Sequence, residues 1–184
     1  MATRSPETPP SRRSRTITFE RRGLGTPRER PATRVAFLGC SLISAYWNGA
    51  ATYYRGLLKA LAAEGLQITF FEPEDDARRV HRDISDPPWA RVRVYPPTEE
   101  GARGALAEAR AADVIVKASG VGVHDQLLER EVLALKGRGR VVVYWDVDAP
   151  ATLERLRSDA TDPFRALVPR YDAIFTYGGG PPVI

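Results

Sequence analysis

The sequence predicts an α/β protein built on a doubly wound, Rossmann-like parallel sheet of about six strands. From Arg34 onward, short apolar runs alternate with segments of helical spacing, which is the pattern of strands joined by right-handed helical crossovers. The runs at 34–39, 113–119 and 140–145 are almost continuously apolar, as expected of strands buried on both faces. The composition, 43% hydrophobic and 27% charged over 184 residues, is that of an ordinary folded domain.

The elements can be placed in order along the chain. The expected strands are residues 34–39, 66–73, 91–96, 113–119, 140–145 and 172–177. The expected helices are residues 49–65, 98–110 and 124–137, followed by two short helical pieces, the second starting at Asp162-Pro163. Gly65 and Gly137 are expected to end their helices, and Thr98 to cap the second one. The first strand should lie near the centre of the sheet, and the alternating run 91–96 near an edge. A polar insertion, 74–88, separates the second and third strands.

Residues 1–33 form a basic segment that differs from the rest of the chain. They hold eight arginines and three glutamates, so the net charge of +4 comes from this segment. The segment is rich in Pro, Ser and Thr and poor in large apolar residues, which predicts disorder. A solvated extension is favoured over a nucleic-acid contact, so no nucleic-acid partner is expected. Residues 34–184 are expected to form the folded domain.

The remaining composition limits the classes of protein. A single cysteine, Cys40, excludes an internal disulfide, and two widely separated histidines argue against a zinc site. No apolar stretch is long enough to span a membrane, and residues 1–33 contain no signal-peptide core. We therefore expect a cytoplasmic protein without a membrane span or a bound metal.

Ligands of doubly wound sheets bind at the carboxyl ends of the strands, so the loops there hold the candidate site. After the first strand, Gly39 is not followed by a G-x-G-x-x-G fingerprint. Ser41 lies early in this loop, and Asn48 is expected to cap the next helix. Tyr46 and Trp47 either pack over the sheet end or stack on a sugar or base. Glu72, at the end of the second strand, is either a ribose-binding acid or a solvated charge, and the solvated alternative is favoured.

Two further loops carry polar residues. After the fourth strand, Gly120 and Gly122 allow the backbone to approach a ligand closely, and Asp125 is expected to cap the next helix. His124 is either a general base or simply an exposed residue. Lys117, inside the strand, either reaches the cleft or extends its amine to solvent.

The fifth strand is followed by two carboxylates. Asp146 and Asp148 are two residues apart and project to the same side of an extended chain. Such a pair can act as a base, hold a ribose or bind a cation. Alternatively, Asp148 caps a helix and Asp146 accepts backbone amides. A functional role is favoured for Asp146.

Five segments together resemble a known family. They are FLGCSLISAYWNGAATYYRGLLKAL, HRDISDPPWARVRVY, VKASGVGVHDQLLE, VYWDVDAPATL and FTYGGGPP. In this order they resemble the amino-terminal half of bacterial glycosyltransferases related to the CgeB-like, spore-coat-associated proteins, over about 34–184. The resemblance implies a GT-B architecture, in which two Rossmann-like domains face each other across a cleft. The first domain receives the acceptor, the second binds the nucleotide-sugar donor, and no metal or other cofactor is needed.

The resemblance also implies which residues line the cleft. The substrate-binding candidates are Ser41, Tyr46, Trp47, Asn48, Gly120, Gly122, Asp148, Gly178 and Gly179. Asp146 and His124 are hypotheses for the catalytic residues. The run YGGGPP resembles the turn that leads into the second domain, so the chain is expected to be catalytically incomplete alone. Its expected partners are a nucleotide-sugar donor and an unknown acceptor once a second domain completes it. Self-association or a split partner chain is also expected.

Two other functions remain open at this point. One is a standalone Rossmann-like module that binds a nucleotide or a protein. The other is an NAD(P)-dependent enzyme, which depends on Glu72 and the glycine loops.

Overall fold

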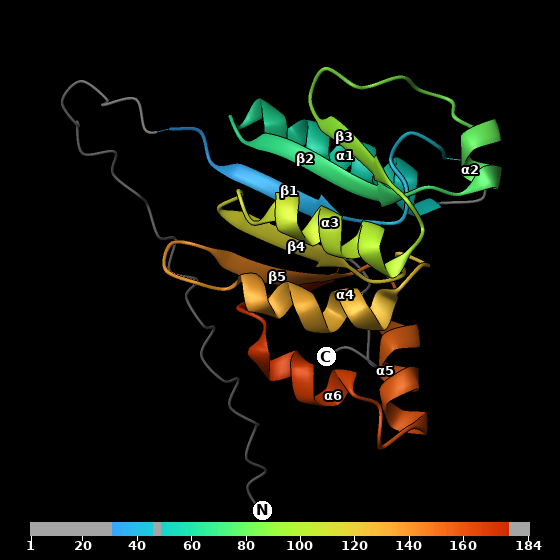
Figure 1. Cartoon of the computed structure of the whole chain (residues 1–184), viewed down its shortest axis with the longest axis vertical. Coiled ribbons are helices and arrows are strands. Elements are labelled where there is room, and N and C mark those ends of the chain that lie inside the picture. The colour runs from blue at the N-terminus through green and yellow to red at the C-terminus, as the bar shows by residue number, and fades with distance from the viewer. Residues whose placement is uncertain (1–30, 46–48, 177–184) are drawn as a thin grey trace, which may run out of the picture. The chain divides into compact units, whose positions relative to one another are not determined.

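A computed structural model describes residues 31–45 and 49–176, and within them it contains one six-stranded parallel sheet (Figure 1). The strands are β1 (Arg34–Leu38), β2 (Gln67–Pro73), β3 (Arg91–Tyr95), β4 (Val114–Ala118), β5 (Val141–Asp146) and β6 (Ala173–Thr176). The helices are α1 (Gly49–Ala63), α2 (Asp76–Val80), α3 (Glu99–Ala109), α4 (Asp125–Glu131), α5 (Ala149–Ser158) and α6 (Phe164–Leu167). Short 3₁₀ turns cover Val132–Leu135 and Val168–Arg170. The predicted Rossmann-like α/β fold is confirmed.

The strand order is β3-β2-β1-β4-β5-β6, and all neighbouring strands are parallel. As predicted, the first strand is central and the alternating run of β3 forms an edge. Chain order reverses between β1 and β4, so these two strands define the switch point where ligands of this fold class bind. The predictions for the tail and for Tyr46, Trp47, Asn48, Gly178 and Gly179 lie outside the described residues.

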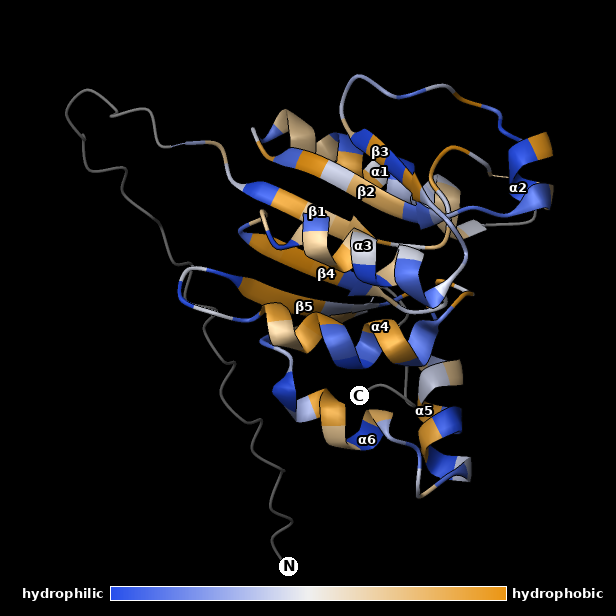
Figure 2. Cartoon of the chain, in the orientation of Figure 1, coloured by the Kyte–Doolittle hydropathy of each residue, from blue (hydrophilic) through white to orange (hydrophobic). Residues whose placement is uncertain are grey.

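The core has two layers, one on each face of the sheet. On one face, α3, α4 and α6 pack against residues such as Leu38, Ile115 and Tyr144. On the other face, α1 is the covering helix among the described residues, and Tyr54 and Leu58 pack there against Phe37 and Phe70. Figure 2 shows hydrophilic and hydrophobic positions alternating along α3 and α4, whereas β4 and β5 are largely hydrophobic.

Several local predictions are confirmed. Thr98 caps α3 by accepting a hydrogen bond from the Gly101 amide at 3.1 Å. Gly65 follows α1 with a φ of +87°, a left-handed conformation that favours glycine.

One prediction needs correction, and one segment contains an additional helix. The polar insertion 74–88 contains α2, whose N-cap residue Asp75 accepts a hydrogen bond from the Arg78 amide. The helix expected over 124–137 becomes a 3₁₀ turn after Glu131 and ends at Leu135, before Gly137. In the described part of the chain, no helix has the length and apolar character needed to cross a membrane.

Candidate functional site

The loop after β1 is organised around a buried carboxylate. Glu72, at the end of β2, is 2% exposed and accepts hydrogen bonds from the amides of Leu42 (2.5 Å) and Ile43 (3.3 Å). Burial raises the pKa of Glu72, although these amides oppose the shift. The favoured expectation of a solvated Glu72 is therefore wrong. The ribose-binding alternative gains no support either, since the carboxylate is bonded to amides of the loop after β1.

The insertion after β2 also forms hydrogen bonds with the loop after β1. Asp83 pairs with Arg55 at 2.6 Å and also accepts the Ala45 amide at 3.1 Å. The hydrogen bond from Arg55 is the main cause that lowers the pKa of Asp83 to about 2; the Ala45 amide adds to it, and burial opposes it. Ser41, a substrate-binding candidate, is fully buried, and its hydroxyl donates to the carbonyl of Ser44. Ser41 therefore stabilises the conformation of the loop and is not exposed to a ligand.

The loop after β4 has a similar internal anion. Asp125 accepts hydrogen bonds from the amides of Val121 (3.1 Å) and Gly122 (2.9 Å), and its Oδ1 lies 2.5 Å from the amine of Lys117. Asp125 is therefore the first residue of α4 and binds amides of the preceding loop. The N-cap of α4, expected to be Asp125, is His124. Gly120 and Gly122 have φ values of +64° and +95°, so the loop requires glycine at both positions.

Lys117 is completely buried, and neither sequence alternative for it is correct. Its amine donates to Asp125 and to the carbonyl of Ala118 at 2.8 Å, and it reaches no solvent. Burial alone would raise the pKa of Asp125, but Lys117 and the two amides outweigh it, so the pKa is lowered. This ion pair lies directly beneath the switch-point edge of the sheet.

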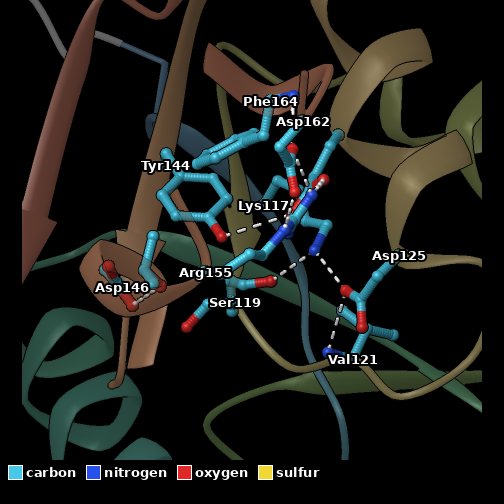
Figure 3. A network of polar contacts seen from close by, with 12 residues as sticks. Lys117, Ser119, Val121, Asp125, Tyr144, Asp146, Arg155, Asp162 and Phe164 are labelled. Atoms are coloured by element: carbon cyan, nitrogen blue, oxygen red, sulfur yellow. Dashed lines mark hydrogen bonds and ion pairs between the residues drawn. The ribbon is translucent and has the colours of Figure 1, made fainter. Parts of the chain in front are cut away.

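A hollow of about 410 Å³ opens where β4 and β5 end, and we call it the carboxyl-edge hollow. It is lined by Ser119, Gly120, Asp125, Glu129, Tyr144, Val147, Asp148, Ala151, Thr152 and Arg155. Figure 3 shows that side chains from β4, β5 and the following helices converge here. Three carboxylates and one guanidinium line the hollow, so its charge is predominantly negative.

The guanidinium of Arg155 is held by two carboxylates. It donates to both oxygens of Glu129, at 3.0 and 3.2 Å, and to both oxygens of Asp162, at 2.6 and 2.9 Å (Figure 3). It also lies 5.3 Å from the centre of the Phe164 ring. Its hydrogen bonds to Asp162 and Glu129 raise the pKa of Arg155, and the bond from Arg155 lowers the pKa of Asp162. Arg155 therefore holds one wall of the hollow.

The two carboxylates after β5 have different positions. Asp146 is 5% exposed, and its Oδ1 accepts hydrogen bonds from the Asp148 amide (3.1 Å) and from the Thr152 hydroxyl (3.0 Å). Asp148 is exposed, lines the hollow and caps α5 through the Ala151 amide. Asp146 thus orients two residues that line the hollow, Asp148 and Thr152.

His124 lies at the same edge of the sheet but in a separate depression. It adopts a left-handed φ of +54°, and its Nε2 lies 3.4 Å from the carbonyl oxygen of Pro97. The depression that it lines also includes Glu99 and Arg130. His124 and Asp146 both follow carboxyl ends of strands, as expected, yet only the Asp146 region adjoins the carboxyl-edge hollow.

Sequence reasoning missed several residues of this site, among them Ser119, Glu129, Thr152 and Arg155. Thr152 could have been found, since it lies one helical turn after Asp148 at the start of a helix. Glu129 and Arg155 are 26 residues apart, so their pairing depends on how α4 and α5 pack. A larger hollow of about 720 Å³ lies near the start of β2, away from these titratable groups.

The fold and site define the chain as a Rossmann-like α/β protein with a hollow at the carboxyl edge of its sheet, into which carboxylate and hydroxyl groups project. No family model, no curated protein and no solved structure matches it. Among residues 31–45 and 49–176, no group of three or more His, Cys, Asp or Glu side chains is arranged to hold a metal ion.

Proposed function

We propose that this domain is the acceptor-binding half of a glycosyltransferase of GT-B architecture, whose nucleotide-sugar donor is bound by a second Rossmann-like domain. The observation that carries the proposal is the carboxyl-edge hollow, which combines hydroxyl groups and carboxylates at the ligand-binding edge of the sheet. Sugar hydroxyls are recognised by such groups, since a carboxylate accepts their protons and a hydroxyl can both donate and accept. The sequence resemblance supports the same assignment.

Three residues supply the contacts in this proposal. Asp148 is exposed at the mouth of the hollow, and one of its oxygens is already used to cap α5. The other oxygen accepts the hydrogen bond of an acceptor hydroxyl. Ser119 accepts the Val147 amide at 2.9 Å, which leaves its own proton to donate. Thr152 donates to Asp146, which leaves its oxygen to accept.

Catalytic roles follow from this arrangement. Asp148 withdraws the proton of the acceptor hydroxyl as the glycosyl group is transferred, and Asp146 positions Asp148 through its amide. His124 lines a separate depression and takes no part in these contacts. Transfer requires donor and acceptor to be held together, so the chain by itself should not transfer a glycosyl group.

The hydrogen bonding of the two loops favours this function over nucleotide binding. Phosphate sites of Rossmann-like folds use free backbone amides at the switch point. Here the amides of Leu42 and Ile43 are occupied by Glu72, and those of Val121 and Gly122 by Asp125. A phosphate would also meet the carboxylates of the hollow. This half is therefore better suited to a neutral or amine-bearing acceptor than to a nucleotide.

Backbone amide NMR titrations test the proposal. A panel of neutral and amino monosaccharides is expected to shift the amides of Ser119–Gly122 and Val147–Thr152, whereas UDP and NAD are expected to leave them unchanged. Asp148→Asn should weaken saccharide binding while keeping the helix, because Asn also caps helices well. Asp159→Asn, an exposed change at the other end of α5, is the matched control. Shifts caused only by UDP or NAD, or no saccharide response at all, would contradict the proposal.

A further inference from the structure

The hollow of about 720 Å³ near the start of β2 opens at the amino edge of the sheet, and we call it the amino-edge hollow. It is lined by the last turns of α1, the start of β2 and residues 88–91, which lead into β3. Apolar side chains form most of its lining, among them Ala62, Leu66, Pro88 and Trp89. Since the carboxyl-edge hollow lies at the other end of the strands, the two hollows are separate surfaces.

The charged side chains of the amino-edge hollow are all positive. Lys59 and Arg91 line it, and no acidic side chain of the described residues does. Both are exposed, and neither side chain forms an ion pair or a hydrogen bond with another described residue. The charge of Arg91 acts on Glu108, but that carboxylate is bonded to Arg93 at 2.8 Å. The predominantly negative carboxyl-edge hollow has the opposite charge balance, so the two hollows select different ligands.

The polar side chains of this hollow are chiefly hydrogen-bond donors. An ammonium, a guanidinium and an indole N–H donate hydrogen bonds and accept none. Lys59, Arg91 and Trp89 supply these groups, and the amide of Gln67 is the one lining side chain among the described residues that also accepts. A ligand that matches this lining therefore supplies acceptor atoms with negative charge, together with apolar surface.

The aromatic wall of the hollow is held in place before any ligand binds. Pro87 and Pro88 restrict the backbone ahead of Trp89, and the Ala90 amide donates to the Pro87 carbonyl at 3.2 Å. Trp89 also packs against the core layer that contains Ile68. A side chain fixed in this way loses little conformational entropy on binding, so the hollow is preorganised for an apolar contact.

We propose that the amino-edge hollow binds an acidic peptide segment of another protein, whose apolar side chains lie against Trp89 and whose carboxylates meet Lys59 and Arg91. Charge complementarity and the apolar lining favour this occupant. Residues 1–33 of the chain itself do not match it, because their eight arginines outnumber three glutamates. Single-stranded nucleic acid is less suited, since it requires a groove of positive charge along its backbone and this hollow offers two cations. The proposal does not rest on the proposed function.

An NMR titration of the full chain with two end-blocked peptides tests the proposal. The probe peptide alternates glutamate with leucine and phenylalanine, and its counterpart has lysine in place of every glutamate. The acidic peptide should shift the indole N–H of Trp89 and the backbone amides of Gln67 and Ala90, and the lysine peptide should leave them unchanged. Added salt should weaken the binding, because exposed charges are screened.

Charge-removing variants show whether the hollow itself binds the peptide. Lys59→Ala and Arg91→Ala should each weaken binding about three- to fivefold, and the double variant about tenfold, as expected for exposed charge contacts. Arg138→Ala is the matched control, because Arg138 is exposed and basic but does not line the hollow. It should bind the peptide as the wild type does. All three positions are exposed, so the variants should keep the wild-type urea midpoint.

Three results would overturn the proposal. The first is an acidic peptide that leaves the signals of the amino-edge hollow unchanged at the highest concentration. The second is peptide binding that the double variant leaves as strong as in the wild type, because the arginines of residues 1–33 would then be the binding groups. The third is an oligothymidylate that shifts the Trp89 signal more strongly than the acidic peptide, which would assign the hollow to nucleic acid. Saccharide binding is measured at the carboxyl-edge hollow, so either proposal can fail alone.

Discussion

The loops after β1 and β4 lie at the switch point, and each is held by a carboxylate that accepts backbone amides. The two carboxylates differ in whether a cation is bonded to them. In each loop, one buried carboxylate accepts two consecutive backbone amides, Leu42 and Ile43 for Glu72, and Val121 and Gly122 for Asp125. Asp125 also pairs with the buried Lys117 at 2.5 Å. Among the described residues, no cation hydrogen-bonds to Glu72.

The pKa values of the two carboxylates shift in opposite directions, and Glu72 has only the more distant charges of Arg78 and Arg82 where Asp125 has a bonded ammonium. Burial raises the pKa of Glu72, and its amides do not offset that effect. Burial also acts to raise the pKa of Asp125, but Lys117 and the amides overcome it and the pKa is lowered. Folding therefore favours the charged form of Asp125 and the protonated form of Glu72. At neutral pH the shift in pKa therefore adds to stability at Asp125 and subtracts from it at Glu72.

The largest effect is expected for Asp125→Asn. Asn keeps the size and one acceptor oxygen, but it leaves the ammonium of Lys117 buried without a counter-charge. Breaking a buried ion pair in this way costs about 3 to 5 kcal/mol, and the lower end is expected because Asp125 is 29% exposed. Urea unfolding near pH 7 measures the change.

Lys117→Met is the control for this prediction. It removes the cation and leaves Asp125 partly solvated, with both of its amide partners, so it should cost clearly less than Asp125→Asn. If the two variants lose equal stability, the loss comes from the packing of the strand and not from an unpaired ammonium.

A smaller loss is expected for Glu72→Ala. It leaves the amides of Leu42 and Ile43 without their acceptor in a buried loop, which costs about 1 to 3 kcal/mol. Hydrogen exchange should accelerate at these two amides more than at the core amides of β1. Unchanged exchange there would show that other groups or water satisfy the loop.

The sequence predicted the sheet well because its signals are local. Continuous apolar runs identified β1, β4 and β5 as strands buried on both faces, and the alternation in β3 identified an edge. Caps such as Thr98 and Asp148 were also predictable, because each side chain binds an amide three residues further on.

The carboxylates were harder to interpret, because their partners are distant in sequence. Glu72 was expected in solvent, yet it binds amides 29 and 30 residues away. That contact depends on the path of the loop after β1, which no periodic pattern specifies. Lys117 breaks the apolar pattern of β4, and only the turn formed by Gly120 and Gly122 brings Asp125 back over it.

The two loops should also respond to acid in opposite ways. The folded-state pKa of Asp125 lies below its ordinary value of 3.8, so its stabilisation is present above that pH and is lost as pH falls through the folded-state value. The stability difference between wild type and Asp125→Asn should therefore shrink only in strong acid. Unfolding midpoints measured down to about pH 3 would show this. A difference that shrinks already at about pH 6 would mean that Lys117 does not hold the carboxylate ionised.

The smallest effect is expected for Glu72→Gln, and its sign is informative. The Gln carbonyl can accept the same amides without a buried charge, so the variant should be as stable as the wild type or slightly more stable near pH 7, within about 1 kcal/mol. The folded-state pKa of Glu72 is raised above 4.5, so the cost of its charge appears as pH rises through that folded value. The advantage of Gln should accordingly fade as pH falls toward 4.5, where the wild-type side chain is protonated as well. Urea midpoints of both proteins near pH 7 and near pH 4.5 measure it. If Glu72→Gln instead loses as much stability as Glu72→Ala, the ionised carboxylate itself stabilises the loop, and the contrast between the two loops would not hold.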